Sequence, residues 1–92
     1  MINIINNFMY NLSLKDIETF LNKEGIFLNQ EELRKTYVYV KNNYLDILKN
    51  PNLVNYNELA GFYTKENFVK ITKLIQKYYN KYGYLINNLN YL

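Results

Sequence analysis

The sequence predicts an all-α fold, a compact bundle of four to five helices that forms a single domain over residues 1–92. Three observations support this prediction. Apolar residues recur every three or four positions along most of the chain, which places them on one face of a helix. Residues that cap helix N-termini precede these segments, and Gly25 and Pro51 separate them. A chain of 92 residues, 49% of them hydrophobic and 21% charged, is typical of one globular domain.

The expected helices cover residues 2–10, 14–24, 30–49, 53–62 and 65–82, followed by an apolar tail at 84–92. The first helix is predicted by apolar residues at helical spacing: Ile2, Ile5, Phe8, Met9 and Leu12. Ser13 begins the second helix, because its hydroxyl and the Asp16 carboxylate can form a capping box. The expected buried face of this helix consists of Ile17, Phe20 and Leu21. Gly25 ends it, since glycine readily adopts the left-handed conformation that follows a helix.

Residues 26–28 are expected to cross over in extended form before the third and longest helix. Asn29 and Glu32 have the spacing of a helix N-terminus, and Glu32 also complements the helix dipole. One apolar seam follows with steps of four and three: Leu33, Tyr37, Val40, Tyr44 and Ile47. Residues 36–40 resemble a strand by residue type, but the helical spacing continues for four turns and favours a helix. Pro51 is expected to end it.

The last two helices are predicted by shorter signals. The segment 53–62 carries Leu53, Leu59, Ala60 and Phe62. Thr64 is placed to cap a final helix that is long and amphipathic. The expected buried face of the final helix is Phe68, Ile71, Leu74, Ile75, Tyr78 and Tyr82, and Gly83 closes it. The apolar residues of the tail fall on one side: Leu85, Ile86, Leu89 and Leu92. We expect this side to dock on the first helix or on a second copy, as a homodimer.

The composition argues against catalysis. The chain has no His and no Cys, and Arg34 is its single arginine. It therefore lacks an imidazole for proton transfer, a thiol nucleophile and the preferred ligands of zinc or iron. Catalysis by Glu58 or Glu66 would need a neighbouring lysine of lowered pKa, which the spacing does not indicate. We expect a protein that is not an enzyme and that holds no metal or cofactor.

Charge is distributed unevenly along the chain. Residues 1–61 hold six basic and seven acidic residues, whereas residues 62–92 hold five lysines and one glutamate. Four lysines fall within one arc of the final helix: Lys70, Lys73, Lys77 and Lys81. This arc is either an ordinary solvated surface or a site for an acidic protein or a phosphate backbone. Four tyrosines lie off the apolar seams and are candidates for the same interface: Tyr39, Tyr63, Tyr79 and Tyr84.

The segment 13–49 also has the outline of a helix-turn-helix, in which the N-terminus of the second helix contacts DNA. That end carries Glu31 and Glu32, which repel phosphates, so an ordinary helical hairpin is favoured.

Several short stretches resemble the YqfT-like proteins of low-GC Gram-positive bacteria, a family of unknown function. They are residues 12–17 (LSLKDI), 25–29 (GIFLN), 59–62 (LAGF) and 63–65 (YTK). The resemblance implies a small helical protein and no activity. The stretch 81–84 (KYGY), after a lysine-rich helix, is also similar to the end of bacteriocin immunity proteins, which are small basic four-helix bundles.

These observations together indicate a small cytoplasmic binding or regulatory protein that contacts another protein through its C-terminal basic helix. Abundant Asn, Lys, Ile and Tyr indicate an AT-rich genome, so a phage- or plasmid-encoded inhibitor is one form of this prediction. The alternatives are an immunity-like bundle and a nucleic-acid-binding module that uses the lysines. No apolar run is long enough to span a bilayer, and the start lacks the basic residues of a signal peptide.

Overall fold

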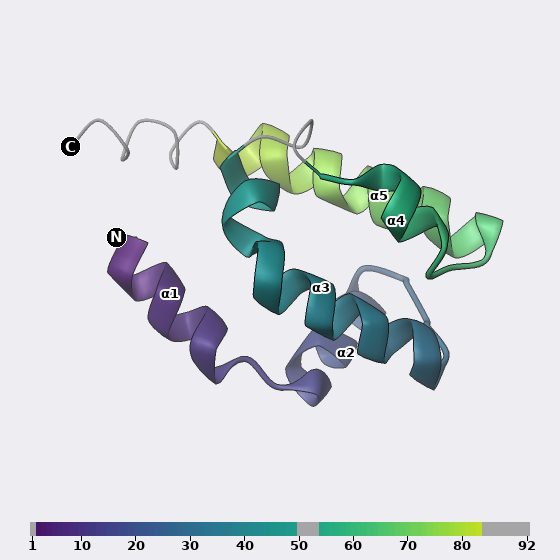
Figure 1. Cartoon of the computed structure of the whole chain (residues 1–92), viewed down its shortest axis with the longest axis horizontal. Helices are drawn as coiled ribbons and strands as arrows, with labels where there is room; N and C mark the ends of the chain where they lie inside the picture. Colours follow the sequence, from purple (N-terminus) through teal and green to yellow (C-terminus); the bar gives the residue numbers. More distant parts are fainter. Residues whose placement is uncertain (1, 50–53, 84–92) are drawn as a thin grey trace.

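The computed structural model describes residues 2–49 and 54–83, and Figure 1 shows their arrangement. Within these residues the chain forms helices and no strand, so the predicted all-α class is confirmed. The α-helices are α1 (Ile2–Asn11), α2 (Leu14–Lys23), α3 (Gln30–Lys49), α4 (Tyr56–Ala60) and α5 (Lys65–Tyr78). A five-residue π-helix, η2 (Tyr79–Gly83), continues directly from α5.

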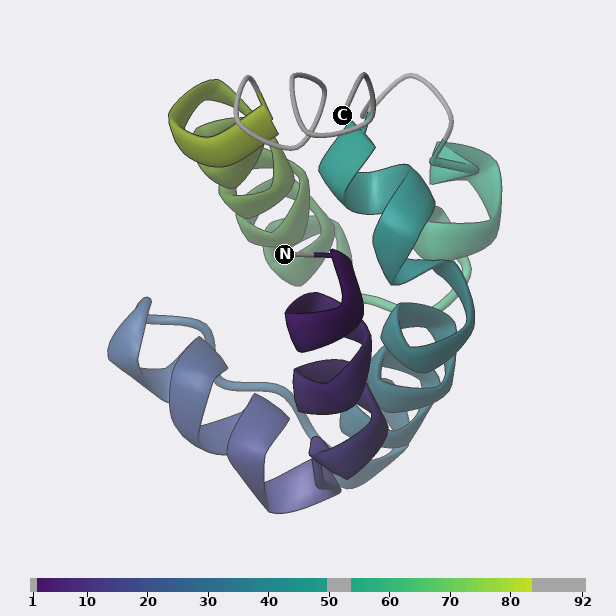
Figure 2. The same cartoon turned by 90° about the vertical axis from the view of Figure 1, so that its left-hand side faces the viewer.

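Helix α3 is the central element of the bundle. It contacts α1, α2 and η2, while α4 packs on α5. Figure 1 shows α3 crossing the middle of the molecule, with α1 and α2 on one side and α4 and α5 on the other. Seen from the side, α2 and α5 are spread apart, with α1 in front (Figure 2). The two halves of the chain therefore meet through α3.

Short-range caps determine where most helices begin. The Ser13 hydroxyl accepts from the backbone N–H of Asp16 at 3.1 Å, and the Asp16 carboxylate accepts from the N–H of Ser13 at 3.0 Å. This confirms the predicted capping box. Gly25 has a φ of +78° and provides the left-handed residue that ends α2. Thr64 caps α5 by accepting from the N–H of Asn67.

The C-terminus of α1 is capped from another helix. No basic residue lies in the last turn of α1, but Lys41 of α3 reaches it. The Lys41 ammonium donates to the backbone carbonyls of Met9, of Tyr10 at 2.8 Å and of Leu12 at 3.1 Å. Carbonyls at a helix end lack partners within the helix, and a positive charge there also complements the dipole. Lys41 therefore fastens α1 to α3.

Two boundaries differ from those predicted. Helix α4 begins at Tyr56 rather than at 53, because the Asn55 side chain caps it by accepting from the N–H of Glu58 at 3.1 Å. Helix α5 ends at Tyr78, and the chain widens into the π-turn of η2 before Gly83. Pro51, the side chain of Tyr82 and the whole predicted tail lie outside the part that the structure describes.

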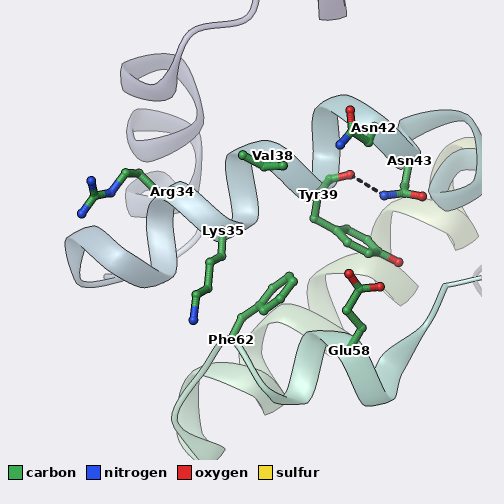
Figure 3. A pocket seen from close by; sticks show the side chains of 8 residues that line it. All are labelled: Arg34, Lys35, Val38, Tyr39, Asn42, Asn43, Glu58 and Phe62. Carbon is green, nitrogen blue, oxygen red and sulfur yellow. Dashed lines mark hydrogen bonds between the residues drawn. The ribbon is translucent and has the colours of Figure 1, made fainter.

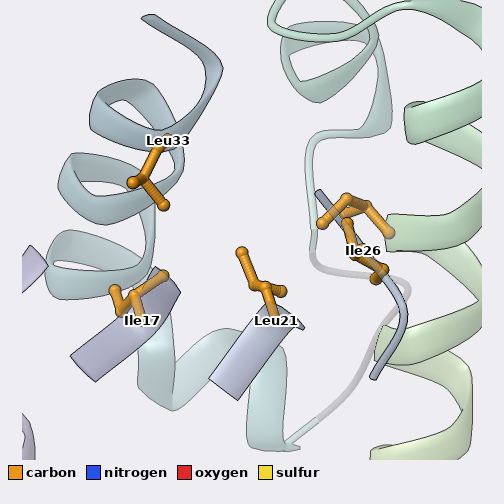
Figure 4. Close-up of a cluster of buried hydrophobic side chains, with 5 residues drawn as sticks. Ile17, Leu21, Ile26 and Leu33 are labelled. Atoms are coloured by element: carbon orange, nitrogen blue, oxygen red, sulfur yellow. The ribbon is translucent and has the colours of Figure 1, made fainter. Parts of the chain in front are cut away.

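The buried side chains form two clusters. The first joins α2, the following loop, α3 and α5 through Ile17, Leu21, Ile26, Leu33 and Ile71 (Figure 4). The second joins α3 to α4 through Tyr39, Val54 and Leu59. Tyr63 and Ile75 pack against both clusters and connect them. Phe20, predicted to be buried, is 40% exposed, because it lies at the edge of α2 against the ring of Tyr78.

Among residues 2–49 and 54–83, no helix combines the length and the apolar character needed to cross a bilayer.

Candidate functional site

The basic face of α5 comprises Lys70, Lys73, Lys77 and Lys81, the last of which lies in η2. Lys70 is half-buried and its ammonium lies 3.5 Å from the Glu66 carboxylate, one turn earlier on the same helix. Lys73 is exposed and makes no ion pair with any residue of the described chain. Exposed pairs of the Lys70–Glu66 kind contribute little to stability, so Lys70 remains available to a partner.

Lys77 has a different role, because it reaches across to α2. Its ammonium lies 3.0 Å from the carboxylate of Glu24, the residue that caps the C-terminus of α2. The Tyr78 hydroxyl donates to the same carboxylate at 2.7 Å. The hydrogen bonds from Tyr78 and Lys77, together with the charges of Lys77 and Lys81, outweigh the effect of burial and lower the pKa of Glu24. Lys77, one residue of the basic face, thus links α5 to the C-terminus of α2.

The candidate tyrosines are not gathered on one surface. Tyr63 was expected off the apolar seams, but it packs against both core clusters, and burial raises the pKa of its hydroxyl to about 12. Tyr39 was expected there too, yet it is only 7% exposed in the second cluster. Tyr39 is covered because α4 packs beside the main seam of α3. Tyr63 is covered because it lies between α4 and α5, where the two core clusters meet. Tyr79 is half-buried in η2, and Tyr84 lies outside the described residues.

A buried carboxylate, Glu32, joins two helix N-termini. It is 5% exposed, and its oxygens accept from the backbone N–H of Asn29 at 3.0 Å and of Thr64 at 3.1 Å. The Asn67 amide donates to both oxygens, at 3.2 and 3.3 Å. Burial raises the pKa of Glu32, but the hydrogen bonds from Asn29, Thr64 and Asn67 together outweigh it and hold the pKa below its usual value. The sequence predicted only the local cap with Asn29.

Two hydroxyl groups, those of Thr36 and Tyr63, continue the hydrogen bonds around Glu32 into the core. The buried Thr36 hydroxyl donates to the backbone carbonyl of Glu32 at 2.7 Å. A hydroxyl carries one proton, so at the 2.5 Å contact between Thr36 and Tyr63 the Tyr63 hydroxyl is the donor. Among the described residues, no buried side-chain nitrogen or oxygen atom lacks a hydrogen-bond partner.

A groove between α3 and α4 is a concave feature that the sequence did not predict (Figure 3). Its volume is about 300 Å³. The lining residues are Arg34, Lys35, Val38, Tyr39, Asn42, Asn43, Glu58 and Phe62. One signal in the sequence points to it: Arg34, Val38 and Asn42 follow at intervals of four, which puts a valine on an otherwise polar stripe. A second hollow, between α1 and α3, is lined by Asn6, Asn7, Met9, Tyr10, Lys41 and Tyr44.

Within the described residues, no three acidic, His or Cys side chains come together in a way that could hold a metal ion. Glu58 lines the groove, and Glu66 pairs with Lys70 on the surface of α5.

No protein-family model matches the chain, and neither a curated protein nor a solved structure matches it. The resemblances to YqfT-like and immunity proteins thus remain predictions from the sequence.

Proposed function

We propose that this chain is a small non-enzymatic cytoplasmic protein that regulates another protein by binding it through the basic face of α5. The observation that carries the proposal is the charge of this face. Within the described residues, Glu66 pairs with Lys70 and Glu24 with Lys77, whereas no carboxylate pairs with Lys73. Lys73, in the middle, is exposed and makes no ion pair within the described chain. An acidic protein surface is the complementary partner.

A protein partner is favoured over nucleic acid by the composition of the face. Arginine is the residue best suited to phosphate recognition, and the single arginine of the chain lies on α3 rather than here. Tyr79, half-buried at the end of α5, adds aromatic surface of the kind enriched in protein interfaces. A phage- or plasmid-encoded inhibitor of a host protein is the biological form that we propose.

Charge reversal on the exposed part of the face tests this proposal. The double variant Lys70→Glu with Lys73→Glu is expected to weaken partner binding about tenfold or more, because like charges would then oppose the acidic partner. Lys77 is left unchanged, since a carboxylate there would repel Glu24 and disturb the packing of α2. Lys65→Glu is the matched control, because it makes the same change at an exposed position of α5 outside the arc. The measurement is capture from an extract of the source cells by the tagged proteins.

One stoichiometric protein that is captured by the wild type and Lys65→Glu, and lost with the double variant, supports the proposal. Recovery of nucleic acid with a steep salt dependence would indicate the nucleic-acid-binding alternative. Recovery of a membrane transporter would favour the immunity-like alternative. Equal capture by all three proteins would contradict a role for the basic face.

We further propose that the apolar tail mediates a homodimer. Ile4 and Phe8 lie one turn apart on α1 and are 70% and 65% exposed, so α1 offers apolar surface for a contact. Light scattering on the full chain and on a chain ending at Gly83 is expected to give a dimer and a monomer, respectively. Equal monomer masses with unchanged thermal stability would contradict any contact through residues 84–92.

A further inference from the structure

The charge of the residues that line the groove between α3 and α4 changes from positive at one end to negative at the other. Arg34 and Lys35 lie at one end, aromatic and apolar side chains form the middle, and Glu58 lies toward the other end (Figure 3). We propose that this groove binds an extended peptide segment of a partner protein, with an acidic side chain at one end, an apolar one next to it and a basic one at the other end. The inference goes beyond the basic face of α5, because it uses none of those lysines.

Two rows of residues on α3 line one side of the groove. Arg34, Val38 and Asn42 lie one above another on α3, since residues four apart share a helix face. Lys35, Tyr39 and Asn43 form the adjacent row, which faces α4. The eight steps along the helix from residue 34 to residue 42 rise about 12 Å. An extended chain advances about 3.3 Å per residue, so a segment of about four residues matches this length.

Arg34 provides the uncompensated positive charge at one end of the groove. Its side chain is exposed and makes no ion pair with any described residue. The neighbouring Lys35 binds Glu31 at 3.1 Å, so its charge is partly compensated, while that of Arg34 is not. The guanidinium group presents donors in a planar fork that matches the two oxygens of a carboxylate. This end therefore suits an aspartate or glutamate of the partner.

The middle of the groove is apolar and partly open to solvent. Val38 is 56% exposed, and Phe62 is half-buried with its ring edge-on to Tyr39 at a centroid distance of 6.0 Å. Tyr39 is itself held in place, because its hydroxyl accepts from the N–H of Asn55 at 3.2 Å. A rigid aromatic floor beside an exposed valine gives an apolar side chain of the partner a surface to cover.

The opposite end is acidic and carries polar amides. The carboxylate of Glu58 is exposed and has no hydrogen bond or ion pair within residues 2–49 and 54–83. The Asn43 amide nitrogen donates to the Tyr39 carbonyl at 2.9 Å, which orients the side chain and leaves its oxygen as an acceptor. Glu58 and the Asn43 oxygen both accept hydrogen bonds, so this end suits a lysine or arginine of the partner.

Three short peptides test the proposed charge order: capped Gly-Glu-Leu-Ser-Lys-Gly, and versions with glutamate or lysine at both charged positions. The readout is the shift of backbone amide signals in two-dimensional nuclear magnetic resonance spectra of the full chain at millimolar peptide. The mixed peptide is expected to shift Arg34, Val38, Glu58 and Phe62. The mixed peptide should bind about three- to fivefold tighter than the peptide with two glutamates or the peptide with two lysines, which is the effect of one surface ion pair.

Single charge reversals should change this preference in a defined way. Arg34→Glu leaves two acidic ends and is expected to bind the peptide with two lysines best. Glu58→Lys leaves two basic ends and should bind the peptide with two glutamates best. The double variant of the basic face, Lys70→Glu with Lys73→Glu, should keep the wild-type preference, which separates this site from the proposed function. Equal binding of all three peptides, shifts away from the groove, or no shift at all would overturn the proposal.

Discussion

Replacement of Glu32 by alanine is expected to lower the free energy of unfolding by about 3 kcal/mol, a large part of the ~5–14 kcal/mol expected for a chain of this size. The carboxylate accepts from donors at the N-termini of two helices that are distant in sequence. Alanine would leave the N–H groups of Asn29 and Thr64 and the amide of Asn67 without this partner. Urea unfolding, followed by circular dichroism, measures the effect.

The adjacent glutamate provides the control. Glu31 makes only a surface pair with Lys35, and its side chain is 74% exposed. Glu31→Ala removes the same group from the same turn of α3, so its expected cost is below about 1 kcal/mol. Equal destabilisation by the two variants would show that Glu32 acts through helix propensity and dipole alone, and not by joining α3 to α5.

The hydrogen bonds of Glu32 also predict that the free energy of unfolding depends on pH. The pKa of Glu32 is lower in the folded protein than its usual value of 4.5, so the folded state favours the charged form. Its contribution is therefore present above pH 4.5 and is lost as the pH falls through the folded-state pKa. The difference in unfolding free energy between the wild type and Glu32→Gln should shrink steadily in this window. A difference that stays constant with pH would contradict the assigned role of the charge.

Tyr39→Ala is expected to produce an effect of similar size, about 3–5 kcal/mol, because it removes a large ring from the second core cluster. The ring is covered by Val54 and Leu59 and contacts Phe62 edge-on. This variant should shift the urea midpoint strongly, since α3 and α4 are joined through this cluster.

Two further variants distinguish the loss of the Tyr39 ring from the loss of its hydroxyl and from a change at an exposed neighbour. Tyr39→Phe keeps the ring and loses only the hydroxyl that accepts from Asn55, so it should cost about 1 kcal/mol. Val38→Ala changes the neighbouring residue, which is 56% exposed, and should cost less than about 1 kcal/mol. If Tyr39→Ala proved as mild as Val38→Ala, Tyr39 would lie on the surface, as its position beside the seam had suggested.

The sequence by itself determined the fold class and most helix starts. Ser13 with Asp16, Asn29 with Glu32, and Thr64 act on N–H groups three residues away, so local spacing was enough to identify them. The strand-like residues 36–40 were also assigned correctly, because the period of the apolar seam extends over more turns than the local preference for a strand. The lysine arc of α5 follows from the same periodicity.

Only the tertiary structure decided which surfaces of the helices meet. Lys41 on the end of α1, Lys77 on Glu24 and Glu32 on Thr64 join residues at least 29 positions apart, and no local pattern encodes such pairs. Tyr39 is buried because α4 covers a second side of α3, and the groove exists because α4 stops short of covering Val38. Periodicity shows which face of a helix is apolar. How many neighbours cover that helix depends on the packing of the whole chain, and this packing decides which charged groups stay free for a partner.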